Sequence, residues 1–146
     1  MAVTALEIFK LAMSLMDGLN ESGQADNSDT AEYKNRTLHI LNILQGELFP
    51  YSDIYEAAEA GKRAIPTPIM KFDAPIESLD DYICISVMPY GLAAHLLMEE
   101  NPSAANFFQQ RYDELKMFLS RGMAAESEDI TDVYGGFAHT EYAYWR

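Results

Sequence analysis

The stretch VMPYGLAAHLLMEENPSAANFF, residues 87–108, decides the fold class. It is apolar and rich in helix-forming residues, yet Pro89 and Gly91 interrupt it. A proline inside a helix removes one backbone donor and bends the helix, whereas a glycine lets a neighbouring element pack closely. The pattern therefore predicts one kinked helix rather than two separate helices, with the bend between Cys84 and Pro89.

Polar residues mark the ends of this helix and of the next. Asp80 and Asp81 suit its start, because acidic residues cap a helix and favour its N-terminal dipole. After the short turn EENP, Asn101 as cap and Pro102 in the first helical position begin a second helix that ends at Gly122. Such a short turn predicts an antiparallel hairpin. The apolar faces expected to pack are Tyr82, Ile85, Met88, Pro89, Leu92, Ala93, Leu96 and Leu97 in one helix, and Ala105, Phe108, Tyr112, Leu115, Phe118 and Leu119 in the other.

The N-terminal residues predict another helix. Thr4 and Glu7 have the spacing of a capping box, in which each side chain bonds the backbone N–H of the other residue. Gly18 is the expected C-terminal stop. Apolar residues recur between these two points at helical spacing, at Leu6, Phe9, Met13 and Met16.

The polar loop NESGQADNSDT separates this helix from the next. Asp29 or Thr30 is the expected cap of a helix that ends where Pro50 prevents continuation. Its apolar stripe is Tyr33, Thr37, Ile40, Leu41, Leu44 and Leu48. The sequence SDIYEAAEAG, residues 52–61, predicts a short further helix that Gly61 closes.

Two segments depart from helical pattern. Residues 62–76 contain Pro66, Pro68 and Pro75, which no regular helix tolerates, so we expect an extended arm of the kind that often contacts a partner. Residues 123–146 begin acidic and end in aromatic residues, which predicts a docking tail. The sequence thus predicts an all-α protein. A bundle of four to five helices occupies residues 1–122 with the arm at about 62–76, and an irregular C-terminal tail occupies residues 123–146.

Composition excludes several function classes. A formal charge of −13 disfavours binding to nucleic-acid phosphates and to anionic membrane surfaces. Cys84 is the only cysteine, so no intrachain disulfide and no thiolate metal site can form. The N-terminus lacks the pattern of a signal peptide. The apolar run of residues 82–98 is flanked by acidic residues and contains a proline and a histidine, which favours a buried core helix over a membrane span.

One carboxylate pattern has the spacing of a catalytic metal site. Glu56 and Glu59, followed by Glu77 and Asp80, match the E-x-x-E and E-x-x-D spacing of all-α nucleotide pyrophosphatases, in which two facing helices hold Mg²⁺. Three prolines lie between the pairs, so a solvated acidic face is the favoured interpretation and the pyrophosphatase an alternative. The histidines are scattered, and the sequence has no phosphate-binding glycine loop and no nucleophile elbow. We therefore expect a protein that is not an enzyme and that uses no cofactor or metal.

Two blocks resemble a known family. They are LDDYICISVMPYGLAAHLLMEENPSAANFFQQRYDEL, residues 79–115, and ITDVYGG, residues 130–136. Together they are similar to the head–tail connector proteins, also called adaptor or head-completion proteins, of tailed bacteriophages and prophages. The resemblance implies a structural role in virion assembly, in the virion and in the host cytoplasm. It implies a homo-oligomeric ring on the portal protein that extends the DNA channel and receives tail or stopper proteins.

The resemblance also implies candidate interface residues. Tyr90 and Gly91 match the helix block, although packing inside the subunit is the favoured alternative for both. The tail block supplies Ile130, Asp132, Val133, Tyr134 and Gly135, and the aromatic terminus adds Tyr142, Tyr144 and Trp145. In such a ring, DNA passes through the channel without sequence-specific binding, and no membrane is involved. A host helical module that binds another protein through its tail is a further alternative.

Overall fold

The computed structural model describes residues 3–56, 58 and 60–122. Its α-helices are α1 (Ala5–Leu15), α2 (Ala31–Leu48), α3 (Asp81–Ser86), α4 (Met88–Leu96) and α5 (Pro102–Gly122), and a 3₁₀ turn, η1 (Phe49–Tyr51), extends α2. Within these ranges no strand forms, and the one isolated β-bridge joins Thr4 to Pro75. The prediction of a small all-α fold is confirmed. No helix in the described part of the chain is long and apolar enough to cross a membrane.

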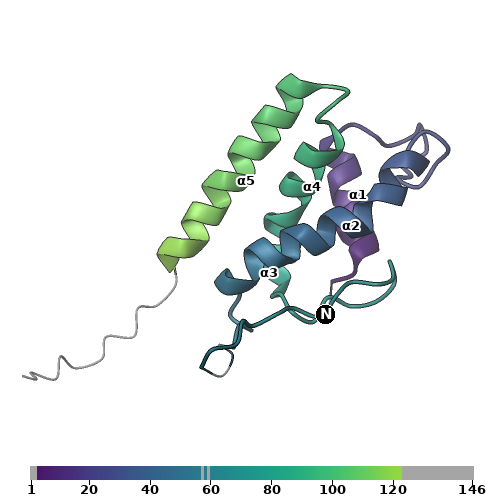
Figure 1. The fold of residues 1–146 in the computed structure, drawn as a ribbon. Helices are drawn as coiled ribbons and strands as arrows, with labels where there is room; N and C mark the ends of the chain where they lie inside the picture. The colour runs from purple at the N-terminus through teal and green to yellow at the C-terminus, as the bar shows by residue number, and fades with distance from the viewer. Residues whose placement is uncertain (1–2, 57, 59, 123–146) are drawn as a thin grey trace, which may run out of the picture.

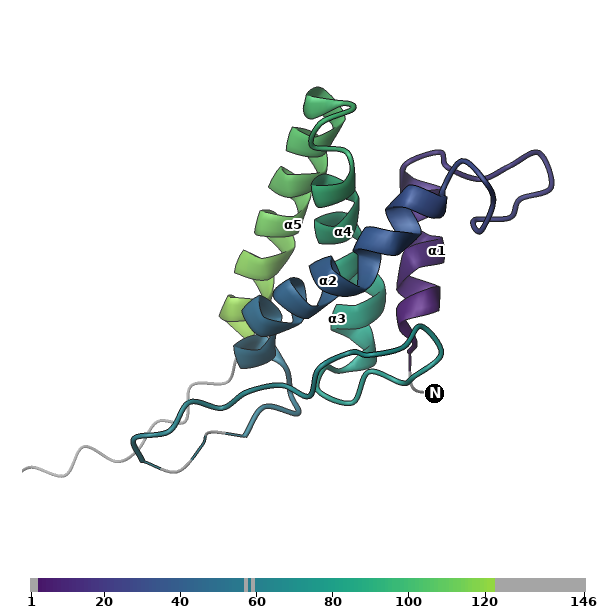
Figure 2. The same cartoon turned by 45° about the vertical axis from the view of Figure 1, so that its right-hand side comes forward.

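Helix α4 lies at the centre of the bundle and packs against α1, α2 and α5 (Figures 1 and 2). α5 runs beside α4 in the opposite direction, as the short turn predicts, and the Asn101 side chain accepts a hydrogen bond from the N–H of Ala104 at 3.1 Å. Almost every side chain of α4 is buried, which explains why its sequence shows little amphipathic pattern. The largest fully buried side chains around it are Phe9, Ile8, Met13, Leu41, Leu44, Leu48, Leu79, Ile83 and Tyr112.

Gly91 sets how closely the helices approach one another. A Cβ atom at this position would lie 2.9 Å from Cε2 of Tyr112 on α5 and 3.0 Å from Cδ2 of Leu44 on α2. The first distance is shorter than real contacts of a Cβ atom, and the second would require Leu44 to shift, so glycine lets α4 fit closely between its two neighbours. The predicted close approach at Gly91 is present, and it lies inside the subunit.

The prediction of one kinked helix is wrong, because the chain forms two helices joined at Val87. Pro89 has no N–H to donate to the carbonyl of Ile85, and its ring crowds that carbonyl. The helix therefore breaks just before the proline, and Pro89 lies in the first turn of α4, where a missing donor costs nothing. The break falls inside the interval 84–89 in which the bend was expected.

The capping box at the start of α1 is confirmed, with Glu7 N–H donating to Thr4 Oγ1 at 3.3 Å and Thr4 N–H donating to Glu7 Oε2 at 2.8 Å. The stop differs from the expected one, because Asp17 rather than Gly18 adopts the left-handed conformation, with φ of 57°. The Gly18 N–H then donates to the Met13 carbonyl at 2.8 Å, which closes a Schellman motif.

The short helix expected at residues 52–61 does not form in the described part of that segment, where only turns and irregular chain follow η1. Local side-chain bonds at Ser52 turn the chain instead, because its hydroxyl donates to Asp80 at 3.2 Å and accepts from the Ile54 N–H at 3.3 Å.

The arm, residues 62–76, contains no helix, and side chains of α2 hold it through its backbone. Asn42 accepts from the Ile69 N–H at 2.8 Å and donates to the Ile69 carbonyl at 2.9 Å, as a neighbouring strand would. Gln45 donates to the Thr67 carbonyl at 3.0 Å, and the Ser78 hydroxyl accepts from the Thr67 N–H at 2.9 Å. The arm is therefore fixed from Thr67 onward.

The end of the arm is fixed to the N-terminus. The Phe72 carbonyl accepts from the Leu6 N–H at 3.1 Å, and the Ile76 N–H donates to the Val3 carbonyl at 2.9 Å. Ile69 and Ile76 are buried in the core, whereas Ile65 is 79% exposed. The part that projects from the bundle is thus the chain between η1 and Thr67 (Figure 2).

Substituting Gly91→Ala should destabilise the fold by about 1–3 kcal/mol, because the new methyl group overpacks the contact with Tyr112 and Leu44. Gly46→Ala on the exposed side of α2, where a Cβ would meet nothing within 4 Å, is the matched control and should stabilise by about 0.5–1 kcal/mol. Urea unfolding measures both. A Gly91→Ala protein as stable as the parent would contradict the packing described.

Substituting Asn42→Ala should leave both backbone groups of Ile69 without their partner, at a cost of about 1–3 kcal/mol. Amide hydrogen exchange at Ile69 should accelerate strongly. Asn20→Ala removes a side chain that bonds only within the exposed loop after α1, and should leave exchange at Ile69 unchanged. Slow exchange retained at Ile69 in the Asn42→Ala protein would show that the arm is held by other contacts.

Candidate functional site

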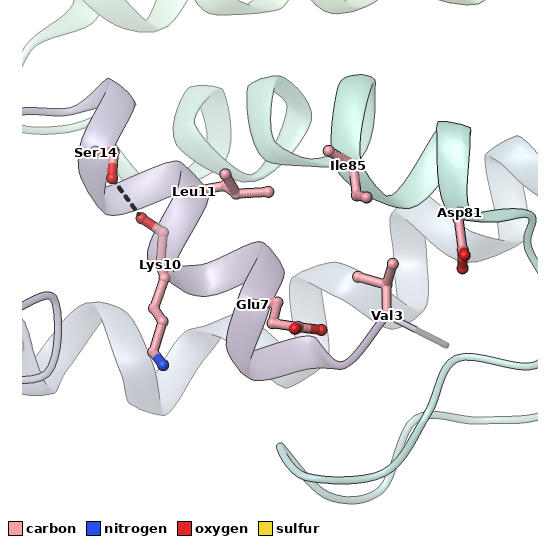
Figure 3. Close-up of a pocket in the computed structure, with 7 residues that line it drawn as sticks. All are labelled: Val3, Glu7, Lys10, Leu11, Ser14, Asp81 and Ile85. Carbon is pink, nitrogen blue, oxygen red and sulfur yellow. Dashed lines mark hydrogen bonds between the residues drawn. The ribbon is translucent and has the colours of Figure 1, made fainter. Parts of the chain in front are cut away.

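A cavity of about 460 Å³ opens between α1 and α3 (Figure 3). Val3, Leu11 and Ile85 provide apolar walls, and Leu11 and Ile85 face each other across the gap. Glu7, Lys10, Ser14 and Asp81 form the polar part of the lining. Glu7 is engaged in the capping box and Ser14 donates to the Lys10 carbonyl at 2.9 Å, so these two groups are already bonded locally.

A second hollow, of about 410 Å³, continues from the first toward α5. It shares Leu11, Ser14 and Ile85 with the first and adds residues of four helices: Leu15, Tyr82, Ser86, Pro89, Tyr90, Arg111 and Leu115. We call the two hollows together the apolar groove. It runs from Val3 to Leu115 across α1, α3, α4 and α5.

The groove exposes side chains that the sequence predicts to be core. Tyr82 is 51% exposed and Ile85 50% exposed, whereas Ile83 and Cys84 are fully buried. The prediction of a buried face at Tyr82 and Ile85 is therefore wrong. Among the described residues, α3 packs on α1 and α4, and no element fills the space between α3 and α5, so this face has no cover.

Sequence reasoning also missed Leu11 and Leu15, which belong to the groove. Both are apolar residues that lie outside the predicted stripe of α1. That position was the signal in the sequence for a second apolar face. An α1 with apolar residues on two faces is typical of a helix that has a second packing partner.

α5 carries another exposed apolar surface beside the groove. Phe107 and Phe118 are 63% and 65% exposed, and they follow the helical spacing of Arg111 and Leu115. Phe118 was predicted to lie on the packing face, and this prediction is wrong, whereas Phe108 and Tyr112 of the same predicted stripe are buried. We call Phe107 and Phe118 the α5 flank.

The candidate interface residues of the helix block have different surroundings. Gly91 is buried between Tyr112 and Leu44 and has no exposed surface to offer a partner. Tyr90 is half-buried in the groove wall, with its ring 6.3 Å from that of Phe108. The other candidates lie outside the described residues: Ile130, Asp132, Val133, Tyr134, Gly135, Tyr142, Tyr144 and Trp145.

The carboxylates of the pyrophosphatase pattern do not lie on two facing helices. Glu56 and Glu77 are exposed and lie in irregular chain, and Glu59 is outside the described residues. Asp80 caps α3, with Oδ1 accepting from the Ile83 N–H at 3.1 Å and Oδ2 from the Ser52 hydroxyl at 3.2 Å. No three His, Cys, Asp or Glu side chains gather into a metal-binding group in the described part of the chain.

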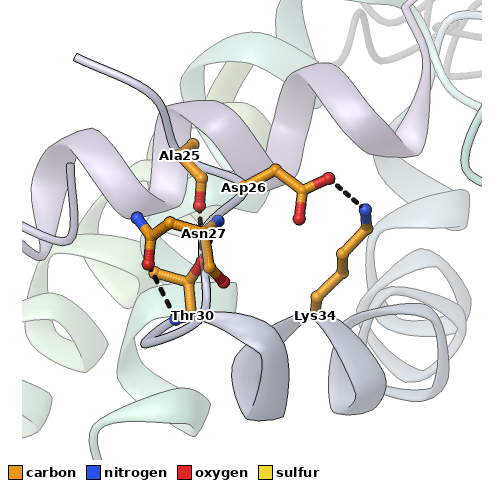
Figure 4. A network of polar contacts seen from close by, with 5 residues as sticks. All are labelled: Ala25, Asp26, Asn27, Thr30 and Lys34. Atoms are coloured by element: carbon orange, nitrogen blue, oxygen red, sulfur yellow. Dashed lines mark hydrogen bonds and ion pairs between the residues drawn. The ribbon is translucent and has the colours of Figure 1, made fainter. Parts of the chain in front are cut away.

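A dense polar network in the loop before α2 has a structural role (Figure 4). Thr30 donates to the Ala25 carbonyl at 2.6 Å, and Asn27 Oδ1 accepts from the Thr30 N–H at 3.1 Å. Lys34 pairs with Asp26. These bonds join neighbouring residues of the loop to one another, and they fix the start of α2 at Thr30. Thr30 is one of the two predicted caps, but its side chain bonds the loop and not the helix.

The ionisable groups in the core are not activated. Burial raises the pKa of Cys84 from its ordinary value of 9.0 to about 12, and the nearby Asp80 and Asp81 act in the same direction. Burial and the neighbouring Glu47 raise the pKa of Tyr112, whose hydroxyl donates to Glu47 at 3.0 Å. A nucleophile needs a lowered pKa, so neither group is prepared for covalent chemistry.

The fold and surface thus define a small all-α protein with an exposed apolar groove. Comparison with protein-family models, with curated proteins and with solved structures finds no significant match to this chain. Its function is therefore inferred from its surfaces and from the sequence resemblance.

Cys84 should not react with a thiol reagent at neutral pH in the folded protein and should react fully in denaturant. Because folding raises its pKa, the unfolded state loses the proton first as the pH rises above 9.0, so the free energy of unfolding should fall from there upward. Thiol labelling and urea unfolding at increasing pH measure the two effects. Rapid labelling of the folded protein would contradict the burial of this thiol.

Proposed function

We propose that this chain is a structural subunit of a phage or prophage head–tail connector, a ring that sits on the portal protein and receives tail or stopper proteins. It acts without catalysis, during assembly in the host cytoplasm and then in the virion. The sequence block that carries the resemblance, residues 79–115, spans α3, α4 and most of α5. DNA passes through the ring without sequence-specific contact, and no membrane is involved.

The observation that carries the proposal is an arm that is bonded to the bundle and yet exposes apolar side chains. Met70, 77% exposed, follows Thr67 and Ile69, whose backbone Gln45 and Asn42 fix by hydrogen bonds, and Ile65, 79% exposed, lies two residues before this fixed part. The fixed part loses little conformational entropy when it binds. Burying each of these side chains would contribute about 1.5–3 kcal/mol, which favours a protein partner.

A ring requires two different surfaces on each subunit, because its interface is head-to-tail. We assign the exposed arm residues Ile65 and Met70 to one side of the interface and the α5 flank, Phe107 and Phe118, to the other. The net charge of −13 suits a channel for DNA, because an acidic lumen does not retain phosphates.

The proposal is tested by mixing the purified chain with the portal protein encoded in the same genome and imaging the complex by electron microscopy. We expect closed rings on the portal. The double substitution Ile65→Glu with Met70→Glu should abolish ring formation, because it would bury a charge at each contact. Ile43→Glu, at a 57% exposed position of α2, is the control and should assemble normally.

Failure of the parent chain to form rings in the presence of portal would overturn the proposal. A monomer without portal would not, because the portal provides the template. Genome neighbourhood gives an independent check: we expect portal, protease and capsid genes upstream. A gene set without them would favour the host interaction module instead.

A further inference from the structure

We propose that the apolar groove is the docking site of the chain's own C-terminal segment, residues 123–146. This inference does not depend on the connector role. It starts from the exposure of Tyr82 and Ile85, each about half exposed, and of Leu15, which is 37% exposed, around one continuous hollow. Apolar surface of this kind on a monomer marks a binding face.

The position of the segment in the chain supports this choice of occupant. It begins directly after α5, and Leu115 in the groove wall precedes Gly122 by only seven residues, about 10 Å along the helix axis. The segment has 24 residues, counted from 123 to 146, and could extend up to about 80 Å. It can therefore reach every part of the groove.

The composition of the segment matches the groove. It contains eight large apolar or aromatic residues, Met123, Ile130, Val133, Tyr134, Phe137, Tyr142, Tyr144 and Trp145, which need cover in water. It also carries five carboxylates, Glu126, Glu128, Asp129, Asp132 and Glu141. The groove lining has the cations Lys10 and Arg111 and also the carboxylates of Glu7 and Asp81, so its apolar side chains carry the match. Arg111 already pairs with Glu114 at 3.2 Å, whereas Lys10 forms no ion pair within the described residues and is the cation that a carboxylate of the segment would meet.

Tethering favours this occupant over a second copy of the chain. A segment joined to the groove by a short linker is present at an effective concentration in the range of about 1 mM, far above that of a separate molecule in dilute solution.

Trp145 is the only tryptophan, so its fluorescence reports directly on the segment in the full-length protein. We expect emission shifted to shorter wavelength and protected from acrylamide, independent of protein concentration. Ile85→Gln in the groove should move the emission to longer wavelength and increase quenching. Ile43→Gln is the matched control, because Ile43 is 57% exposed on α2 and Ile85 50% exposed on α3, and it should change neither readout.

Circular dichroism must show that each variant retains its helices, and Leu11→Gln on the opposite wall provides a second groove variant. Trp145 emission typical of solvent in the parent chain would overturn the proposal. Emission unchanged in both folded groove variants would do the same, and so would a shift that disappears on dilution, since the occupant would then be a second copy. None of these readouts uses portal or the arm, so they stand apart from the test of ring formation.

Discussion

The contact of α4 with α2 and α5 at Gly91 is the constraint on which the rest of the structure depends. A helix that is buried on every side must approach its neighbours at the backbone, and here one position without a side chain accommodates both Leu44 and the ring of Tyr112. Tyr112 is in turn oriented by its hydrogen bond to Glu47 on α2. The three helices therefore interlock at a single level, and the other elements are arranged around them.

The break at Val87 follows from the same central helix. Pro89 is tolerated because it lies in the first turn of α4, where a backbone N–H has no carbonyl partner within the helix. Because of the break, α3 is a separate helix. It packs on α1 and α4 while Tyr82 and Ile85 face the groove. Pro89, which interrupts an otherwise helical sequence, thus places an exposed apolar surface next to the buried core.

Local signals in the sequence predicted much of the fold. The capping box at Thr4 and Glu7, the cap at Asn101 and the prolines of the arm each act within a few residues, so their effects can be deduced without tertiary information. The assignment of faces was harder. Whether Ile83 or Ile85 is buried depends on which helix lies opposite, and a short helix next to a uniformly apolar one gives no periodicity to decide it. The groove was missed for the same reason, since its walls come from four helices.

The hydrogen bonds at the two ends of the loop between Ser52 and Thr67 determine which sequence changes the fold can accept. Ser52 is tied to Asp80, and Thr67 to Ser78 and Gln45, so both ends of the loop between Ser52 and Thr67 are fixed to the bundle beside the start of α3. The free energy of closing a loop grows only slowly with its length once its ends are fixed. Insertions or replacements in this loop should therefore leave the helices undisturbed, and recognition carried by the loop can diversify separately from folding.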